Sequence, residues 1–567
     1  MRIALAQLNF TVGAFEGNFA KIAAAVARAR VEQADLVVFS ELAATGYPPR
    51  DLLTHPRFID LNLDLLARVA ALSDDRLAIL IGYVDRNPSS DGKPLHNSVA
   101  LCASGRVVDR HHKLLLPTYD VFDEDRYFEP GRQVTPMNLG EWRLGVSICE
   151  DVWNDPTFWP KRLYHRDPIA ELVAQGSDVM INCSASPFEL QKIDVRRRMI
   201  RQEALDSRSY FFYLNQVGGS DELVFDGHSI GIDPLGNDVV RMRDFEEDFA
   251  VYDVPDPNRE PEERAAGGSS RIGAVLRDVG QSDEETAYRA LVLGLGDYVR
   301  KCGFTSVVLG LSGGIDSALT ACLAAEALGP DRVFSVALPA RYSSAHSVND
   351  AEALARALGI DHRVIPIDGI FQAYLDQLAP AFAGRQEDVT EQNIQARVRG
   401  GVLMALSNKF GHLLLTTGNK SELAVGYCTL YGDMCGGLAA ISDVPKTLVY
   451  RLARYVNRSR TIIPESTLTK APSAELKPNQ TDQDTLPPYD VLDRIVEAYV
   501  ERNLDIDGIA ALGLDRAVVA EVVRKIDASE YKRRQAAPGI KISSKAFGVG
   551  RRYPIAADYS AIDRGKG

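Results

Sequence analysis

Residues 307–328, VVLGLSGGIDSALTACLAAEAL, have the types and spacing expected of a phosphate-binding turn. A buried strand leads into a Gly-rich turn and an amphipathic helix, and Gly313 and Gly314 let backbone N–H groups approach an anion. The positive end of the helix points to the same place. Asp316 stands where the lysine of a G-x-x-x-x-G-K-[ST] loop would be, and a carboxylate repels phosphate unless a metal lies between them. Since Mg²⁺ binds through one or two carboxylates plus phosphate oxygens, the sequence predicts Asp316 as a magnesium ligand.

A second set of residues, in the first half of the chain, fits amide hydrolysis. Glu41 and Cys149 come at the ends of apolar runs, and Lys113 lies between them in the sequence. A cysteine thiolate attacks an amide when a base takes its proton and a donor stabilises the oxyanion. The three residues are similar to the Glu-Lys-Cys pattern of the nitrilase-like amidohydrolases, over residues 1–235. This resemblance implies that Glu41 is the base, Cys149 the nucleophile and Lys113 the cation beside the oxyanion, with Glu124 orienting Lys113 and relaying protons.

The second half of the chain carries further motifs around the Gly-rich turn. The segment SGGIDS (312–317) resembles the pyrophosphate loop of the ATP pyrophosphatase superfamily, whose members split ATP between the α and β phosphates and transfer AMP to a carboxyl or carbonyl oxygen. The absent lysine is consistent with this, because the γ-phosphate is not the group transferred. Four other segments resemble NAD synthetase: TEQNIQARVRG (390–400), LLTTGNKSELAVGYCTLYGDMCGGLAAISDVPKT (414–447), PSAELKPNQTDQDTLPPYDVLD (472–493) and YKRRQAAPGIKISSKAFGVGRRYPI (531–555).

The resemblance to NAD synthetase implies a role for individual residues of the second half. Asp316 and Glu422 would hold Mg²⁺, with ATP as co-substrate. Where small ammonia-using members carry Thr before ADL, this chain has Ser473 before AEL, which keeps a hydroxyl. The implied ATP-binding residues are Gly310, Leu311, Ser312, Gly313, Gly314, Ile315, Asp316, Ser317, Thr417, Lys446 and Ser473. The implied deamido-NAD-binding residues are Asn393, Arg397, Glu422, Asp433 and Lys532.

The first half, in turn, resembles the glutaminase part of glutamine-dependent NAD synthetases. This resemblance implies a glutamine pocket lined by Tyr47 and Tyr119, with Ser186 beside the amino acid. A cationic Lys192 would pair with the α-carboxylate of glutamine and Glu150 with its α-ammonium group. Other amidotransferase types do not fit, because position 2 is Arg rather than Cys and Cys149 lies in SICED rather than in a G-x-C-x-G elbow.

These residues need elements to position them, and the sequence predicts an α/β protein with two domains. Over 1–255, short apolar runs alternate with helical stretches such as 18–33, which we expect Asn18 to cap. The segment 256–285, rich in Pro, Gly, Ser and charge, is typical of a linker. The domain of 286–567 alternates strands (305–311, 332–338, 362–367) with helices (among them 346–358), as in a parallel sheet. The strands predicted in the first domain are 2–10, 35–40, 76–84, 97–103, 143–149, 178–184 and 210–217. The resemblances imply a nitrilase-like αββα sandwich followed by a Rossmann-like ATP pyrophosphatase domain.

Composition limits the classes of binding partner and the cellular compartment that we expect for this protein. The formal net charge is −13, from 64 basic and 77 acidic residues, which argues against a nucleic-acid binder. Seven scattered cysteines without a C-x-x-C pair predict neither disulfides nor a zinc site, and so a reducing compartment. The N-terminus lacks the apolar core of a signal peptide, and no apolar run approaches the roughly 18–20 residues that span a bilayer. We therefore expect a cytoplasmic protein without nucleic-acid or membrane partners, and the family resemblance implies a homo-oligomer.

The combined expectation is a ligase that amidates deamido-NAD to NAD with ammonia released from glutamine, forming AMP, pyrophosphate and glutamate. Two-domain chemistry of this kind implies an internal passage for ammonia. One alternative is another glutamine-dependent ATP pyrophosphatase ligase with a different carboxylate acceptor. A second is a catalytically silent nucleotide-sensing or scaffold protein, which would be expected to lack one of Glu41, Lys113, Cys149 or Asp316, and all four are present.

Overall fold

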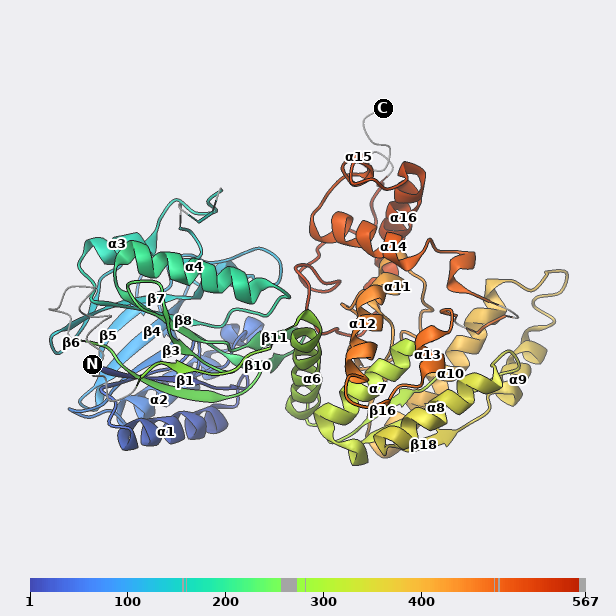
Figure 1. Ribbon diagram of the computed structural model, residues 1–567, viewed down its shortest axis with the longest axis horizontal. Coiled ribbons are helices and arrows are strands. Elements are labelled where there is room, and N and C mark those ends of the chain that lie inside the picture. Colours follow the sequence, from blue (N-terminus) through green and yellow to red (C-terminus); the bar gives the residue numbers. More distant parts are fainter. Residues whose placement is uncertain are drawn as a thin grey trace. The chain divides into compact units, whose positions relative to one another are not determined.

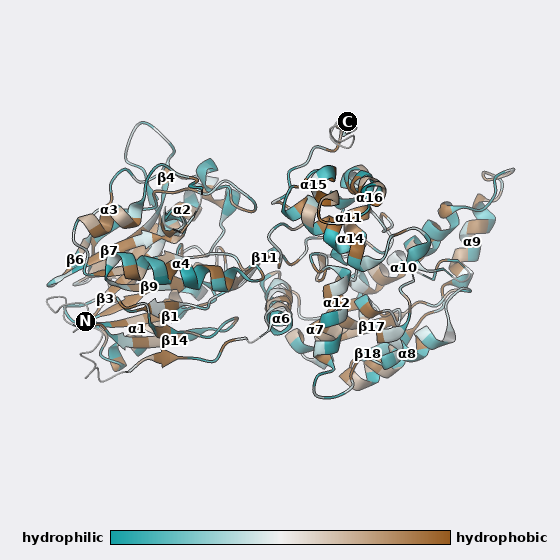
Figure 2. Cartoon of the chain, turned by 45° about the horizontal axis from the view of Figure 1, so that its top comes forward, coloured by the Kyte–Doolittle hydropathy of each residue, from teal (hydrophilic) through white to brown (hydrophobic). Residues whose placement is uncertain are grey.

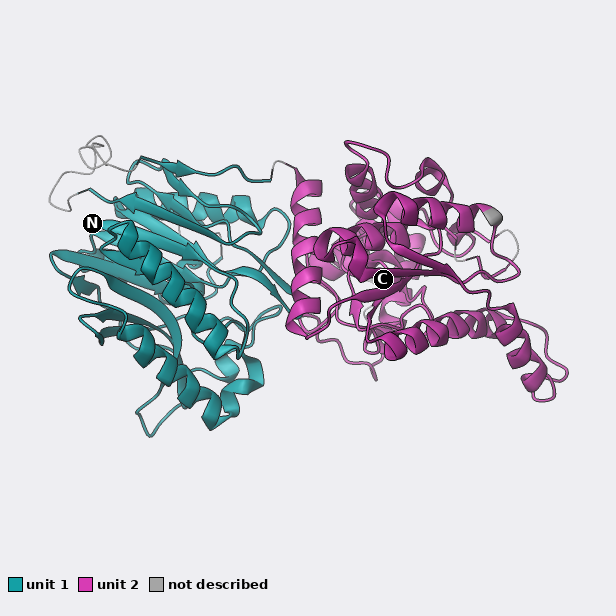
Figure 3. Cartoon of the chain, turned by 90° about the horizontal axis from the view of Figure 1, so that it is seen from below, with its two compact units in different colours: residues 1–281 teal, residues 282–567 magenta. Residues whose placement is uncertain are grey.

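The computed structural model describes residues 1–155, 158–159, 161–255, 273–280, 282–473, 475–477 and 480–559. It divides into two compact units, Met1–Gln281 and Ser282–Gly567 (Figures 1 and 3). Part of the predicted linker, 256–272 and 281, lies outside the described residues. Within the rest of it, β15 (Val275–Leu276) joins a sheet of the first unit and α6 begins at Asp283. The domain limits inferred from the sequence stay a prediction.

The first unit is built from two large sheets, each with parallel and antiparallel pairs, and a small hairpin. The strands before β15 are β1 (Arg2–Gln7), β2 (Leu36–Val38), β3 (Ala78–Arg86), β4 (Leu95–Ala103), β5 (Arg106–His112), β6 (Met137–Leu139), β7 (Trp142–Ile148), β8 (Val179–Ser184), β9 (Tyr210–Asn215), β10 (Val217–Ser220), β11 (Leu223–Asp226), β12 (Ile230–Ile232), β13 (Asp238–Arg241) and β14 (Asp248–Asp253). One sheet has the order β14-β1-β2-β3-β4-β5, the other β15-β13-β12-β9-β8-β7-β6, and β10 pairs with β11. Each of the seven strands predicted here overlaps an observed one.

Side-chain alternation along the strands explains why the two sheets stack. On β2, Leu36 and Val38 face an apolar core shared with β7, β8 and β9, whereas Val37 faces α1 and α2. On β8, Ile181 faces the same shared core, and Met180 packs against α4. Successive residues of a strand point to opposite faces, so a continuous apolar run buries both faces of each sheet. Figure 2 shows apolar strands such as β7 and β9 beside the hydrophilic visible side of α4.

In the described part of the first unit, four helices complete the αββα sandwich, which confirms the predicted fold class. They are α1 (Phe15–Val31) and α2 (Pro56–Ala70) on the first sheet, and α3 (Pro168–Ala174) and α4 (Lys192–Ser207) on the second. The predicted cap Asn18 is wrong, because α1 begins at Phe15 and Asn18 lies inside it. Its amide instead donates to the carbonyl of Thr11 (2.9 Å) and accepts from the backbone N–H of Thr11 (3.1 Å). The side chain therefore pins the preceding turn to the helix.

The second unit contains a sheet in which every described pair is parallel. Its strands are β16 (Val307–Gly310), β17 (Val333–Ala337), β18 (Asp361–Val364), β19 (Leu413–Thr416) and β20 (Leu438–Ala439), in the order β18-β17-β16-β19-β20. The chain runs outward from β16 on one side through β17 and β18, and then continues on the other side with β19. In open sheets of this kind, ligands bind beyond the carboxyl ends of the strands where the order reverses. That point lies between β16 and β19.

Helices surround this sheet and form a separate apolar cluster near the C-terminus. Those around the sheet are α6 (Asp283–Lys301), α7 (Ile315–Leu328), α8 (Ala345–Leu358), α9 (Asp368–Leu378), α10 (Val389–Phe410), α12 (Lys446–Val456) and α13 (Glu465–Thr469). The cluster joins α11 (Lys420–Val425), α14 (Tyr489–Val496), α15 (Ile506–Ala510) and α16 (Arg516–Ala528), followed by α17 (Glu530–Arg533). Within the described residues, no helix is both long and apolar enough to cross a bilayer.

Candidate active sites

Cys149 begins a short 3-10 turn directly after β7 and is buried. Its φ is +43°, a left-handed conformation that costs energy for a residue other than glycine. Asn182 of the adjacent strand β8 lies below the turn, and its amide donates to the carbonyl of Cys149 (3.4 Å). The strand end and the sharp turn therefore fix the position of the thiol.

Glu41 lies in the loop after β2 and has no exposed surface. Its Oε1 accepts hydrogen bonds from Lys113 Nζ and Asn97 Nδ2, each at 2.7 Å, and its Oε2 accepts from the backbone N–H of Ala185 at 2.9 Å. Gly82 of β3 lets this loop pack closely, since a Cβ on it would lie 2.5 Å from the carbonyl oxygen of Ser40. The carboxylate is thus held by three separate segments of the chain.

Lys113, directly after β5, is fully buried and pairs with two carboxylates. Its ammonium lies 2.7 Å from Glu41 Oε1 and 2.8 Å from Glu124 Oε2. Glu124 also accepts from the hydroxyl of Tyr47 at 2.8 Å. Burial by itself lowers the pKa of Lys113, but the charges of Glu124 and Glu41 outweigh it and raise the pKa well above its usual value. The lysine is therefore a permanent cation beside Cys149.

The protonation state of Cys149 follows from the same surroundings. Burial raises the pKa of the thiol far above its usual value, and the charge of Glu41 adds to this, while Lys113 opposes it. The resting residue is consequently a neutral thiol, so a base must take its proton when it attacks. The charges of Glu41 and Lys113 act on the pKa of this thiol in opposite directions, and the two side chains can supply a base and a cation.

Glu150, the residue after Cys149, faces two tyrosine hydroxyls. Tyr119 donates to its carboxylate at 3.0 Å and Tyr164 at 3.0 Å. Burial raises the pKa of Glu150 to about 7, although Lys113 and the two hydroxyls favour the charged form. Tyr164 was not predicted, because it lies in a segment that carries no motif of its own.

Ser186 and Lys192 lie on the segment that leads from β8 into α4. Ser186 is buried, and its backbone N–H donates to Asn215 Oδ1 at 2.9 Å. Lys192 donates to the carbonyl of Pro187 at 3.1 Å, and its ammonium lies 5.2 Å from the ring of Trp153.

Among the residues predicted for the first unit, the structure joins Glu41, Lys113, Glu124 and Tyr47 in one hydrogen-bonded group.

Asp151 is a positioning residue that the sequence did not reveal. Its Oδ1 accepts from the backbone N–H groups of Leu114 (3.0 Å) and Leu115 (2.9 Å), and its Oδ2 accepts from that of Ile148 (3.0 Å). One carboxylate thereby ties the segment after Lys113 to the turn that carries Cys149. The available signal was its position two residues after Cys149, close to the end of an apolar strand. A carboxylate that is buried there needs hydrogen-bond partners.

In the second unit, the Gly-rich turn has the geometry of an anion cradle. Gly313 has a φ of +78°, and a Cβ on it would lie 2.2 Å from the carbonyl oxygen of Ser347. The hydroxyls of Ser312 and Ser317 lie 3.1 Å apart, and Ser317 also donates to the carbonyl of Gly314 at 2.9 Å. The turn directly precedes α7, so its N–H groups and the start of the helix face the same space.

Asp316, Glu422 and Lys446 form a charged cluster beside this turn. The ammonium of Lys446 lies 2.5 Å from Asp316 Oδ2 and 3.1 Å from Glu422 Oε1, and Asn419 Nδ2 donates to Asp316 Oδ1 at 2.9 Å. Burial raises the pKa of Glu422 to about 7, in opposition to the charge of Lys446. Two carboxylates that share one cation fit Mg²⁺, which binds through one or two carboxylates together with substrate phosphates. Among the residues that the structure describes, no three metal-ligating side chains gather into a cage.

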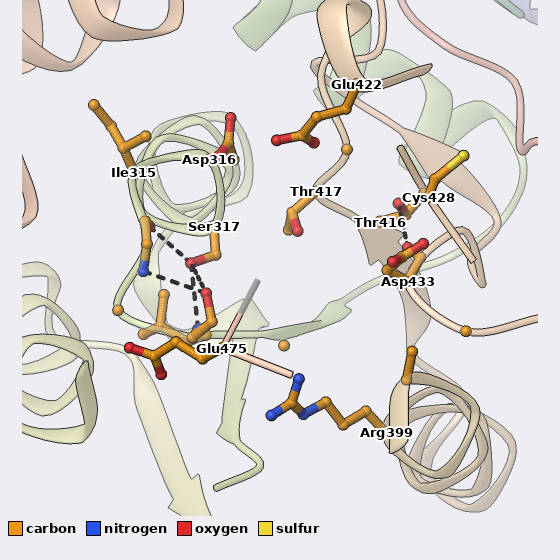
Figure 4. Close-up of a pocket in the computed structure, with 18 of the residues that line it drawn as sticks. Ile315, Asp316, Ser317, Arg399, Thr416, Thr417, Glu422, Cys428, Asp433 and Glu475 are labelled. Atoms are coloured by element: carbon orange, nitrogen blue, oxygen red, sulfur yellow. Dashed lines mark hydrogen bonds between the residues drawn. The ribbon is translucent and has the colours of Figure 1, made fainter. Parts of the chain in front are cut away.

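A pocket connects the turn, the acidic cluster and the carboxyl ends of β16, β17 and β19 (Figure 4). Most of the residues implied by the resemblance line it: Gly310, Leu311, Ser312, Gly313, Gly314, Ile315, Asp316, Ser317, Thr417, Glu422, Asp433, Lys446 and Ser473. Burial raises the pKa of Asp433 to about 6. The pocket also contains charged residues that were not predicted, namely Arg399, Lys470, Glu475 and Asp482.

Three predicted residues are absent from the pocket lining and instead contact one of its walls, the loop 426–433. Asn393 Oδ1 accepts from the hydroxyl of Thr429 at 2.8 Å, and Arg397 Nε donates to the carbonyl of Leu430 at 3.2 Å. Lys532 Nζ donates to the carbonyls of Gly426 (2.7 Å) and Cys428 (2.8 Å). In the structure these three side chains hold the loop that carries Asp433.

Comparison with known proteins assigns each half of the chain to a family. Residues 2–258 match the carbon-nitrogen hydrolase family and residues 287–536 match the NAD synthase family. The chain is 47% identical over 559 residues to a glutamine-dependent NAD(+) synthetase of Synechocystis sp., covering 98% of each chain.

The chain belongs to the glutamine-dependent NAD(+) synthetase family. A second member, from Thermotoga maritima, is 44% identical over 581 residues and matches 98% of both chains. Among solved structures, the glutamine-dependent NAD+ synthetase from Acinetobacter baumannii in complex with ADP aligns with a TM-score of 0.75, 38% identity and 98% coverage of each chain. Membership in this family confirms the resemblances of both halves and the assignment as a ligase.

Proposed function

We propose that this enzyme amidates deamido-NAD to NAD with ammonia released from glutamine, at the expense of ATP. The observation that carries the proposal is that one chain holds a Cys149–Glu41–Lys113 site in its first unit and a pyrophosphate-type turn backed by Asp316 and Glu422 in its second. The products are NAD, AMP, pyrophosphate and glutamate.

Glutamine hydrolysis proceeds through a thioester on Cys149. The sulfur attacks the γ-carbonyl carbon while Glu41 takes the thiol proton, and the ammonium of Lys113 stabilises the oxyanion. The proton on Glu41 then passes to the leaving nitrogen, the C–N bond breaks and ammonia departs. Glu41 next takes a proton from water, which cleaves the thioester to glutamate and restores the thiol. Glu124 keeps Lys113 charged and oriented.

Recognition of glutamine rests on charge complementarity at both α-groups. Glu150 pairs with the α-ammonium and Lys192 with the α-carboxylate, and Ser186 adds polar contacts. Tyr47 and Tyr119 line the pocket. The hydroxyl contacts of the two tyrosines support this, because they place Tyr119 against the glutamine-binding residue Glu150 and Tyr47 against Glu124.

In the second unit, the turn 312–317 binds the ATP phosphates that leave as pyrophosphate, with Thr417, Lys446 and Ser473 contributing further contacts. The carboxylate of deamido-NAD attacks the α-phosphorus, pyrophosphate leaves, and ammonia displaces AMP from the acyl adenylate. Asp316 and Glu422 would hold Mg²⁺, which neutralises phosphate charge when bound. Asp433 faces deamido-NAD in the pocket, and Asn393, Arg397 and Lys532 secure the loop beside it. The ammonia passage, the homo-oligomer and the cytoplasmic location stay predictions.

The proposal is tested by measuring NAD, AMP and glutamate from deamido-NAD and Mg-ATP, with glutamine and separately with ammonium chloride. Wild-type enzyme should form NAD and AMP from both nitrogen sources. Cys149→Ala should lose synthesis from glutamine and retain synthesis from ammonium. Cys102→Ala, which changes another buried cysteine of the first unit, is the matched control and should retain both.

Loss of both activities in Cys149→Ala, with Cys102→Ala unaffected, would contradict the assignment of one reaction to each unit. No NAD from either source in the wild type, with glutamine still hydrolysed, would favour the alternative ligase with a different carboxylate acceptor.

A further inference from the structure

Three cationic side chains line the pocket of the second unit, and they differ in their partners. Lys446 lies between the two carboxylates of the acidic cluster, and Lys470 lies 2.5 Å from Glu475 Oε1. For Arg399, no carboxylate lies within ion-pairing distance in the described part of the chain. Among the described residues that line this pocket, Arg399 is thus the cation without an ion-paired carboxylate.

The position of Arg399 leaves most of its hydrogen-bond donors directed into the pocket. The side chain rises from α10, and its Nε donates to the carbonyl of Leu338, the residue after β17, at 3.2 Å. A guanidinium has five N–H donors, and the remaining four make no hydrogen bond within the described residues. Figure 4 shows the guanidinium of Arg399 pointing away from the helix that carries it, into the space among the labelled pocket side chains.

Arg399 lies two residues after Arg397 on α10. Residues of a helix turn by about 100° each, so the two side chains leave α10 on different faces. Arg397 is exposed and contacts the loop 426–433, whereas Arg399 is half-buried and lines the pocket. Burial lowers the pKa of Arg399, with Glu475 and Asp433 acting in the opposite direction.

A desolvated cation with free donors is unfavourable unless a ligand satisfies it. A guanidinium forms two parallel hydrogen bonds with phosphate oxygens, which an ammonium cannot do. The pyrophosphate-type turn shares the pocket with Arg399, so the ligand that reaches both is a nucleotide.

We propose that Arg399 binds a phosphate group of a nucleotide substrate in this pocket. The inference rests on the proposed function, which supplies two sources of that phosphate: the triphosphate of ATP and the pyrophosphate bridge of deamido-NAD. Arg399 is then a binding residue of the synthetase reaction, separate from Arg397.

The test compares Arg399→Gln and Arg399→Lys with Lys409→Gln, which removes an exposed cation from the same helix. Ammonium chloride serves as nitrogen source, so that the first unit is not needed. The KM values of ATP and deamido-NAD are measured separately, and ATP binding is followed by titration calorimetry, which requires no NAD formation. Thermal unfolding of each variant is recorded.

We expect Arg399→Gln to weaken one nucleotide by on the order of 10- to 100-fold, the usual effect of losing a charge-assisted hydrogen bond. Arg399→Lys should lie between Arg399→Gln and the wild type, and Lys409→Gln should match the wild type. A change confined to ATP, in KM and in calorimetry, assigns the phosphate to ATP, and one confined to the KM of deamido-NAD assigns it to the dinucleotide.

Unchanged affinities for both nucleotides in Arg399→Gln would overturn the proposal. It would also be overturned if both affinities fell equally, Arg399→Lys were no better and the unfolding midpoint dropped, because the side chain would then only support β17 through Leu338. If the wild type made no NAD but calorimetry still showed ATP binding that depends on Arg399, the proposed function would fail and the phosphate contact would stand.

Discussion

Glutamine affinity should depend on pH through Glu150. Burial raises the pKa of this carboxyl to about 7 in the free enzyme, despite the opposing effects of Lys113 and the hydroxyls of Tyr119 and Tyr164. As the pH falls through this value, Glu150 takes up a proton and loses the charge that attracts the α-ammonium of glutamine. Each pH unit below the pKa lowers the ionised fraction about tenfold. The KM of glutamine should therefore rise about tenfold between roughly pH 8 and pH 6.

The assay follows glutamate release against glutamine concentration at several pH values, with Mg-ATP and deamido-NAD saturating. Synthesis driven by ammonium, measured at the same pH values, reports changes in the second site. Glu150→Gln is the control, because its amide keeps the size of the side chain but does not titrate. We expect its KM to be high and to vary little over this pH range.

Two results would refute this reasoning. One is a wild-type KM that stays constant from about pH 8 to pH 6, since Glu150 would then not titrate in this range or not contact the α-ammonium. The other is a KM in Glu150→Gln that rises at low pH in parallel with the wild type, which would assign the titration to another group.

Three further substitutions test other parts of the structure. Lys113→Met leaves two buried carboxylates without their cation and should lower the free energy of unfolding by about 3–5 kcal/mol. Urea unfolding followed by tryptophan fluorescence would measure this, because all three tryptophans lie in the first unit, namely Trp142, Trp153 and Trp159. An unchanged urea midpoint would contradict the buried ion pair. Gly313→Ala should abolish NAD formation from both nitrogen sources while glutamine hydrolysis continues, since the added Cβ would lie 2.2 Å from a backbone oxygen. Glu422→Gln should raise the Mg²⁺ concentration for half-maximal AMP formation by at least about tenfold, and an unshifted magnesium titration would remove Glu422 from the metal site.

Much of both sites could be predicted from the sequence, because their key residues follow local patterns. Cys149 directly follows β7, Glu41 lies in the loop after β2, and residues 311–314 form the turn between β16 and α7. The strands could be predicted because short apolar runs of β-branched and aromatic residues are typical of buried strands. The contacts between these residues, on which their proposed roles depend, are seen only in the structure.

The residues that were missed depend on contacts between distant parts of the chain. Tyr164 reaches Glu150 from a loop without a motif, and Asp151 joins two segments through backbone groups that carry no sequence signal. Arg399 illustrates a different limit, since a motif containing two arginines does not state which of them faces the pocket. Asn18 failed as a helix cap because a side-chain amide can bind a preceding turn as well as a helix end.

The contact of Lys446 with both Asp316 and Glu422 has a consequence for how the pocket receives a substrate. Its ammonium acts as an internal counter-ion, so the two acids stay close together between turnovers and do not repel one another apart. An approaching polyphosphate consequently meets a region of partly cancelled charge instead of two bare carboxylates. In the function that we propose, the nucleotide would bring Mg²⁺ to Asp316 and Glu422, and Lys446 would exchange these carboxylates for phosphate oxygens. Because Lys446 offsets part of the negative charge of Asp316 and Glu422, a highly charged substrate can enter the pocket without meeting two unpaired carboxylates.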